Sequence, residues 1–164
     1  MIPTPATDPY DWPALLALIT RAFAYMEGRI DPPSSLHSLT PQGLARSGEV
    51  WVLGQPALAC MVLKPVEGAL YLGKLAVEPA LQGQGLGRLM VARAEGRARE
   101  MRLDRLELET RVELVENHRF YLGLGFIEVS RSAHPGFDRP TSVRYAKPVQ
   151  GVPRVGISKN RCKP

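Results

Sequence analysis

Three glycines at alternate positions fall within residues 82–88, whose sequence is QGQGLGR. A backbone without Cβ atoms can bring several N–H groups together around an anion, most effectively at the N-terminus of a helix. The spacing does not fit the dinucleotide-binding fingerprint, whose glycines are separated by two and then three positions. It does not fit the P-loop, because Gly87 is followed by Arg88 and Leu89 rather than by lysine and a hydroxyl residue. The stretch therefore predicts a phosphate site of another kind.

The elements on either side of this stretch follow from hydrophobic periodicity. Residues 69–77 are mostly apolar and end at Glu78-Pro79, which predicts a strand. From about residue 85 a helix is predicted, because apolar residues recur on one face. That stripe consists of Leu86, Met90, Ala94, Ala98 and Met101. The glycine stretch therefore joins a strand to the N-terminus of a helix that packs on a sheet.

Helices and strands elsewhere are predicted from caps, apolar spacing and turn residues. A first helix is expected over residues 9–25 with Asp8 as its cap, and a second over 40–46 with Thr40 as its cap. A further helix is expected over 115–124, and Gly125 then occupies the left-handed position that ends it. Six strands are expected, over residues 50–53, 57–63, 69–77, 105–110, 127–132 and 142–147.

The order of these elements indicates the topology of the sheet. Short turns between the first three strands favour an antiparallel meander, whereas a helix between two strands requires a parallel crossover. We therefore expect an α/β (α+β) fold, with a mixed, mostly antiparallel central sheet of about six to seven strands flanked by about four helices.

Composition limits the class of protein. A chain of 164 residues, 45% of them hydrophobic, is long enough for one sizeable core, and a single domain is expected. No run approaches the roughly 18 uncharged apolar residues of a membrane span, and residues 1–11 lack the pattern of a signal peptide. We expect no membrane association and a cytoplasmic location. Cys60 lies in an apolar run, so it is predicted to be a core residue. Cys162 lies near the chain end in a different setting, so no disulfide between the two is predicted.

The net charge of +5 is unevenly distributed. Residues 150–164 contain four basic residues and no acidic ones, which leaves 17 basic and 16 acidic residues in the rest of the chain. We therefore divide the chain into a body, 1–148, and a basic C-terminal tail, 149–164. Nucleic-acid binding depends on clustered positive charge, so a nearly neutral body argues against it.

The strand, the glycine stretch and a later block together resemble the GNAT acetyltransferase superfamily. Its cofactor signature asks for Gln or Arg, two free positions, Gly, one free position, and Gly or Ala, which Gln82, Gly85 and Gly87 satisfy. About thirty residues later a second block follows in the expected order, formed by Asn117, Phe120, Tyr121, Gly125 and Phe126. The resemblance covers residues 2–148, and its fold agrees with the element order above.

This resemblance implies that acetyl-CoA is the cofactor. The N–H groups of residues 83–88 would bind its pyrophosphate, and the backbone of Leu75 and Val77 would pair with its pantetheine arm as if with another strand. The Val77 N–H would stabilise the oxyanion. The cofactor-binding residues implied are Leu75, Ala76, Val77, Gln82, Gly83, Gln84, Gly85, Leu86, Gly87, Arg88, Asn117, Phe120 and Tyr121.

Tyr121 stands at the family's position for the general acid that protonates the leaving thiolate. A phenol with a pKa of about 10 is a usable donor to a thiolate whose conjugate acid has a pKa near 8.5. Asn117 lies four residues earlier, on the same helix face. Tyr121 could instead be a core aromatic residue, and Asn117 a helix cap.

The acceptor half of the site is less defined. The family implies that residues 24–39 and the loop before the last strand border the acceptor, so Tyr25, Met26, Tyr71 and His134 are candidate substrate contacts. Some family members have a basic glutamate at the position of Tyr71. Its absence leaves three alternatives for the base, namely a water relay, Glu109 or an acceptor that arrives deprotonated.

We therefore expect an N-acetyltransferase that moves an acetyl group from acetyl-CoA to a primary amine of a small molecule or peptide. The amine would attack directly in a ternary complex, without metal or covalent enzyme intermediate. A homodimer is compatible with the family. Two alternatives are a non-catalytic protein that responds to acyl-CoA, and a nucleic-acid-associated protein that acts through the basic tail.

Overall fold

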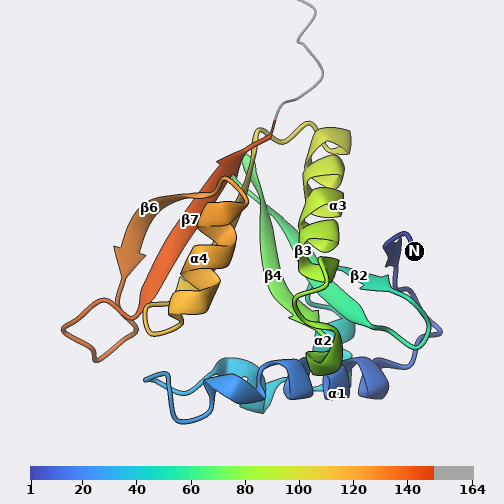
Figure 1. Ribbon diagram of the computed structural model, residues 1–164, viewed down its shortest axis with the longest axis horizontal. Helices are drawn as coiled ribbons and strands as arrows, with labels where there is room; N and C mark the ends of the chain where they lie inside the picture. The colour runs from blue at the N-terminus through green and yellow to red at the C-terminus, as the bar shows by residue number, and fades with distance from the viewer. Residues whose placement is uncertain (150–164) are drawn as a thin grey trace, which may run out of the picture.

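A computed structural model describes residues 1–149 of the chain, and Figure 1 shows them as a seven-stranded mixed sheet with helices on both faces. The strand order is β1-β2-β3-β4-β5-β7-β6. The strands are β1 (Thr4–Pro5), β2 (Glu49–Leu53), β3 (Ala59–Val66), β4 (Ala69–Val77), β5 (Arg105–Arg111), β6 (Ile127–Ser132) and β7 (Ser142–Pro148). The helices are α1 (Trp12–Ala22), α2 (Pro41–Ala45), α3 (Leu86–Glu100) and α4 (Val115–Gly123), with 3-10 turns η1 (Ala24–Met26), η2 (Ser35–Ser38) and η3 (Pro79–Leu81).

Each face of the sheet has its own hydrophobic core. On one face the buried stripe of α3, from Met90 to Ala98, packs with Tyr121 of α4 against inward side chains of the central strands. On the other face α1 and α2 cover alternate residues of β2 and β3, and Leu18 and Leu44 are buried there. Strand residues alternate between the two cores because successive side chains point to opposite faces.

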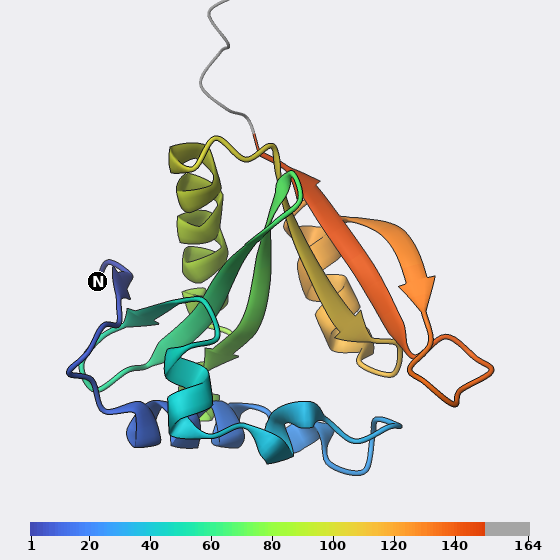
Figure 2. The same cartoon turned by 180° about the vertical axis from the view of Figure 1, so that it is seen from behind.

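The sheet opens in its middle, between β4 and β5. These two strands are parallel, as predicted, and they pair only over Ala69–Tyr71 and Arg105–Glu107. Beyond these residues the strands diverge, which the ribbons of Figures 1 and 2 show from opposite sides. Every other neighbouring pair in the sheet is antiparallel. The divergence leaves backbone groups of β4 and β5 without a partner strand, and it sets the position of the cleft described below.

Most predicted elements are confirmed within one to three residues, and the differences have local causes. The cap of α1 is Asp11 rather than Asp8, because the Asp11 carboxylate accepts a hydrogen bond from the Ala14 N–H at 3.0 Å. Asp8 accepts from the Trp12 indole instead. Strand β1 was not predicted, since a strand of two residues, one of them a proline, has no periodicity to detect. The helix-ending conformation of Gly125 is confirmed by its φ of 92°.

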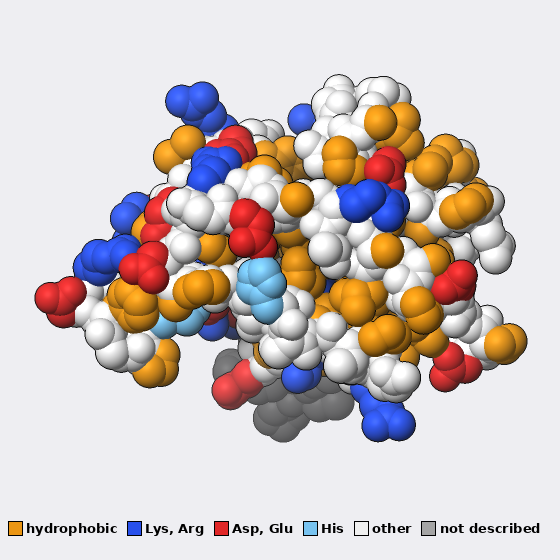
Figure 3. Space-filling view, turned by 90° about the horizontal axis from the view of Figure 1, so that it is seen from below, with side chains coloured by type: hydrophobic (Ala, Val, Ile, Leu, Met, Phe, Trp, Pro, Cys, Tyr) orange, Lys and Arg blue, Asp and Glu red, His pale blue; other side chains and the backbone are white. Residues whose placement is uncertain are grey.

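The packed body extends at least to Val149, which is buried and donates its N–H to the Asp104 carbonyl at 2.9 Å. Cys60 is buried in the core, as predicted, and burial raises the pKa of its thiol to about 12. The basic tail and Cys162 lie outside the described residues. Acidic and basic side chains are interspersed on the face seen in Figure 3, as a nearly neutral body predicts.

Candidate active site

A cleft of about 950 Å³ lies where β4 and β5 separate. It is bordered by the glycine stretch, the N-terminal half of α4, and the segment after α1. All the candidate site residues predicted from the sequence except Gln84 line it. Those that do are Tyr25, Met26, Tyr71, Leu75, Ala76, Val77, Gln82, Gly83, Gly85, Leu86, Gly87, Arg88, Asn117, Phe120, Tyr121 and His134. The chain fold therefore brings together residues more than 100 positions apart.

The glycine stretch has a conformation that requires glycine. Gly83 and Gly85 have φ values of 79° and 87°, and a Cβ added to either would meet no atom within 4 Å. Gly85 is the N-cap of α3, so the free N–H groups of the first helical turn begin there. A Cβ on Gly87 would lie 3.2 Å from the ring of Phe120. The stretch is thus an open turn at a helix N-terminus, with α4 packed close behind it.

Strand β4 has an irregularity that turns its backbone towards the cleft. Cys60 pairs with Ala76 whereas Val62 pairs with Gly73, so β4 carries one extra residue in between. Lys74, in this bulge, has a φ of 48°. Beyond the bulge the Glu78 N–H donates to the carbonyl of Leu58, the residue before β3.

Because backbone groups alternate along a strand, those of Val77 point to the opposite side, where β5 has departed. The Val77 carbonyl accepts a hydrogen bond from the Gln82 amide at 3.3 Å. Gln82 therefore ties the glycine stretch to the end of β4.

Tyr121 is 9% exposed and lies at the inner wall of the cleft. Its ring packs edge-on against Phe120 and Phe126, with centroids 5.1 and 5.5 Å away. Burial raises the pKa of its hydroxyl well above the ordinary value, and the nearby hydroxyls of Tyr25 and Tyr71 act in the same direction. The phenol is therefore neutral, and a proton donor, throughout the physiological pH range.

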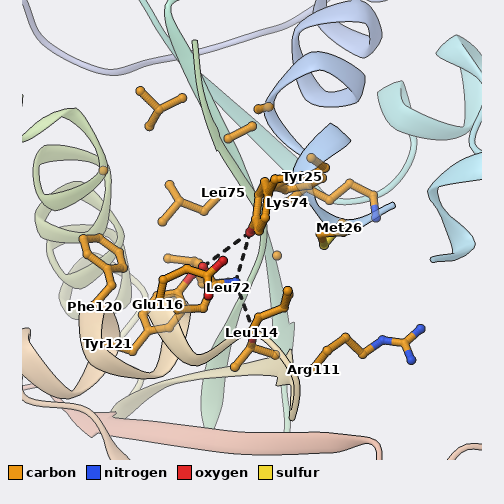
Figure 4. A pocket seen from close by; sticks show the side chains of 18 of the residues that line it. Tyr25, Met26, Leu72, Lys74, Leu75, Arg111, Leu114, Glu116, Phe120 and Tyr121 are labelled. Atoms are coloured by element: carbon orange, nitrogen blue, oxygen red, sulfur yellow. Dashed lines mark hydrogen bonds between the residues drawn. The ribbon is translucent and has the colours of Figure 1, made fainter. Parts of the chain in front are cut away.

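Residues 24–39 connect α1 to α2 along the chain, and we call them the strap. The strap crosses the cleft and contacts the start of α4. The Asn117 amide donates to the Tyr25 hydroxyl at 3.2 Å and to Thr110 at 3.3 Å. Arg29 forms a second link, because its guanidinium pairs with Glu116, with Nη2 and Oε2 2.9 Å apart. Figure 4 shows Tyr25 and Met26 of the strap facing Glu116 and Tyr121 across the pocket.

Three groups in the cleft could exchange protons, and their surroundings differ. Glu109 forms an ion pair with Arg144, with Oε1 and Nη2 2.8 Å apart. The pKa of Glu116 is lowered to about 2, chiefly by hydrogen bonds from Arg29. The pKa of Tyr71 is raised by burial, and the backbone of Glu109 hydrogen-bonds its hydroxyl. Neither Glu116 nor Tyr71 is therefore a strong base near neutral pH.

His134 is held in place by Thr141. Its backbone N–H donates to the Thr141 hydroxyl at 2.9 Å, and its Nδ1 lies 2.5 Å from the same oxygen. The Thr141 hydroxyl also lies 3.4 Å from the Ser132 carbonyl.

Several residues of the cleft were not predicted from the sequence. Lys74 lies in a β-bulge, which no sequence pattern predicts. Thr110 and Arg111 belong to β5, and hydrophobic periodicity does not predict where β5 diverges from β4. Glu116 directly precedes Asn117, which belongs to the second family block. Its position next to this block, three residues after the acidic Glu113, is the sequence signal that could have identified it as a site residue.

The fold is GNAT-like, which comparison with solved structures shows. The ribosomal-protein-S18-alanine N-acetyltransferase of Escherichia coli is 22% identical, covers 94% of this chain and 98% of its own, and has a TM-score of 0.68. An acetyltransferase of Streptococcus agalactiae is 20% identical over 89% and 96% of the chains, with a TM-score of 0.69. A Bacillus anthracis protein described as a streptothricin acetyltransferase, in complex with acetyl coenzyme A, is 19% identical over 61% of each chain, with a TM-score of 0.56.

The acetyltransferase (GNAT) family model matches residues 12–126. This chain therefore belongs to the GNAT acetyltransferase family, as its two sequence blocks predicted. No curated protein sequence matches it closely enough to count as a relative. Within residues 1–149, no helix has the length and apolar character needed to cross a membrane.

Proposed function

We propose that this protein is an acetyl-CoA-dependent N-acetyltransferase that acetylates a primary amine by direct attack in a ternary complex. One observation carries the proposal: the open glycine turn at the start of α3, the free edge of β4 and the buried Tyr121 hydroxyl face a single cleft. An anion site, a strand edge and a proton donor are the three parts that an acyl-CoA reaction needs.

The residues present fit coenzyme A. The turn formed by Gly83 and Gly85 leaves space where a side chain would stand, and the N–H groups of the first turn of α3 are free for phosphate oxygens. Arg88 lies beside them in the cleft. The backbone of Val77 faces the gap left by β5, so an amide chain can pair with it. The cofactor supplies the acetyl group as a thioester, and every other contribution comes from this chain.

Tyr121 holds the proton that the departing sulfur takes up. Burial makes the phenol a weaker acid, but it also raises the pKa of a thiol in the same pocket, because both anions lose hydration there. The difference between the two pKa values, which governs the transfer, is therefore largely kept. The Val77 N–H stabilises the negative charge that develops on the carbonyl oxygen.

Few groups in the cleft could accept the proton that the attacking amine releases. The pKa of Glu116 is about 2, so Glu116 is not a strong base near neutral pH, and the Glu109 side chain is engaged in an ion pair with Arg144. A water relay and an acceptor that arrives deprotonated therefore stand as the better alternatives.

Replacing Glu116 with glutamine tests this exclusion. Since the Glu116 pKa lies below its ordinary value, its ion pair stabilises the fold at pH values above that ordinary value and is lost only as the pH falls towards 2. If Glu116 is not the base, Glu116→Gln should leave the acidic limb of the kcat/KM profile in place. Only the KM for the acceptor should change, because Arg29 loses its ion-pair partner. A profile that loses its acidic limb would instead make Glu116 the base.

Titration of acetyl-CoA into the protein by calorimetry is the primary test of the proposal. We expect saturable one-to-one binding, followed by thiol release when amines are added. Failure to bind would refute the proposal. Binding without thiol release on a broad amine panel would favour the non-catalytic acyl-CoA-responsive protein.

A further inference from the structure

The side chains that line the cleft are unequal in charge. Four are basic, namely Arg29, Lys74, Arg88 and Arg111, and two are acidic, Glu109 and Glu116. Both acids already have cationic partners, since Glu109 pairs with Arg144 and Glu116 with Arg29. Arg88 lies at the glycine turn, at the cofactor end. The two cations left for the acceptor end are Lys74 and Arg111.

Lys74 is placed by the bulge of β4. Its positive φ turns this residue out of the regular strand, and its side chain enters the cleft. Within residues 1–149 no carboxylate lies within ion-pair distance of its ammonium group. An ammonium group has three donors to satisfy.

Arg111 is the last residue of β5, where that strand is farthest along its divergence from β4. Its Nη2 donates to the Pro33 carbonyl of the strap at 3.3 Å. Its Nη1 is enclosed and has no hydrogen-bond partner among the described residues. The acids that face it, Asp31 and Glu113, contact Arg139 at 3.4 and 3.6 Å, and the Glu113 Oε2 atom has no hydrogen-bond partner among the described residues. A buried cationic donor without a partner is costly, so an anion in reach would bind strongly.

We propose that the acceptor is an amine that also carries a carboxylate, and that Lys74 and Arg111 bind this carboxylate. Figure 4 shows the two side chains extending to the same side of the pocket, past Met26 and away from Tyr121. The carboxylate is thereby held at one end of the cleft while the amine lies at the other, near the reacting carbonyl. This inference rests on the proposed acetyltransferase function and names its substrate class.

The same two cations repel further positive charge. Polyamines, which carry several positive charges and no carboxylate, are therefore disfavoured by this arrangement.

A thiol-release screen with matched amines tests the inference. Each α-amino acid and ω-amino acid is compared with its own carboxamide, and polyamines are included. We expect kcat/KM to be roughly 10- to 100-fold higher for the carboxylate member of the best pair, as a charged hydrogen bond provides. Lys74→Gln and Arg111→Gln should each reduce that ratio towards one. Lys64→Gln, an exposed lysine on β3, is the matched control and should keep the ratio.

The outcomes separate the two proposals. Equal rates for carboxylate and carboxamide, or a preference for polyamines, would overturn the carboxylate inference while leaving the acetyltransferase function intact. If no amine releases thiol, calorimetry of the same amino acids with protein saturated in coenzyme A decides the matter. Binding that both variants lose would support the carboxylate site even though the catalytic proposal had failed, and binding that neither variant changes, or no binding, would refute it.

Discussion

Tyr121→Phe is expected to lower kcat by roughly 10²- to 10⁴-fold, the contribution that a positioned general acid makes. The ring contacts with Phe120 and Phe126 remain, so the fold and the affinity for acetyl-CoA should be unchanged. Only the proton for the leaving sulfur is removed. Steady-state thiol release measures kcat, and calorimetry measures cofactor affinity.

Tyr145→Phe provides the matched control for this substitution. Tyr145 is also a buried tyrosine, but its hydroxyl hydrogen-bonds with His118 Nδ1 at 2.6 Å and does not line the cleft. Removing that hydroxyl should cost about 1 kcal/mol of stability and leave kcat in place. If Tyr121→Phe turned over as fast as the wild type, the acid would be another group. Because burial raises the Tyr121 pKa, ionisation of this phenol should produce no alkaline limb below about pH 10 in the wild type.

Gly85→Val is expected to weaken acetyl-CoA binding by roughly 10²-fold or more. A β-branched residue is a severe outlier at the φ of 87° that Gly85 adopts, so the turn must change conformation. The N–H groups at the start of α3 then no longer converge, and each lost hydrogen bond to a charged phosphate contributes about 1.5–3 kcal/mol. Calorimetric titration of acetyl-CoA gives the change directly.

Gly123→Val separates this effect from a general cost of replacing glycine. Gly123 lies at the end of α4, has no left-handed φ, and a Cβ there meets no atom within 4 Å. Its substitution should leave cofactor affinity within about twofold, because valine is tolerated in a helix at least as well as glycine. Equal losses from Gly85→Val and Gly123→Val would remove the glycine turn from the cofactor site.

The glycine stretch and the Asn117 block could be recognised from sequence because each is a local pattern with fixed spacing. The stripe of α3 was likewise local, and Met90 and Ala94 are buried as their periodicity predicted. These features form the side of the cleft that we propose for the cofactor. They also identify the family, since two blocks at the right separation are seldom accidental.

The acceptor side could not be predicted in the same way. Lys74 reaches the cleft through a bulge, and the strap meets α4 through Arg29 and Glu116, 87 residues apart. Such contacts depend on where the chain returns in space, not on spacing along it. The prediction of Asp8 as the cap of α1 was wrong for a local reason. Asp8 and Asp11 both precede a possible first turn that contains proline, and only the folded geometry selects Asp11.

The divergence of β4 from β5 places two strand edges inside the molecule. Exposed edges usually invite other chains to add to the sheet, and proteins protect them by covering or charging them. Here the strap covers the gap, held by Tyr25 to Asn117 and by Arg29 to Glu116. A slender, flexible chain of amides can enter beneath it, whereas a strand belonging to another folded protein cannot. The opening that accommodates a ligand is therefore also protected against sheet-to-sheet aggregation.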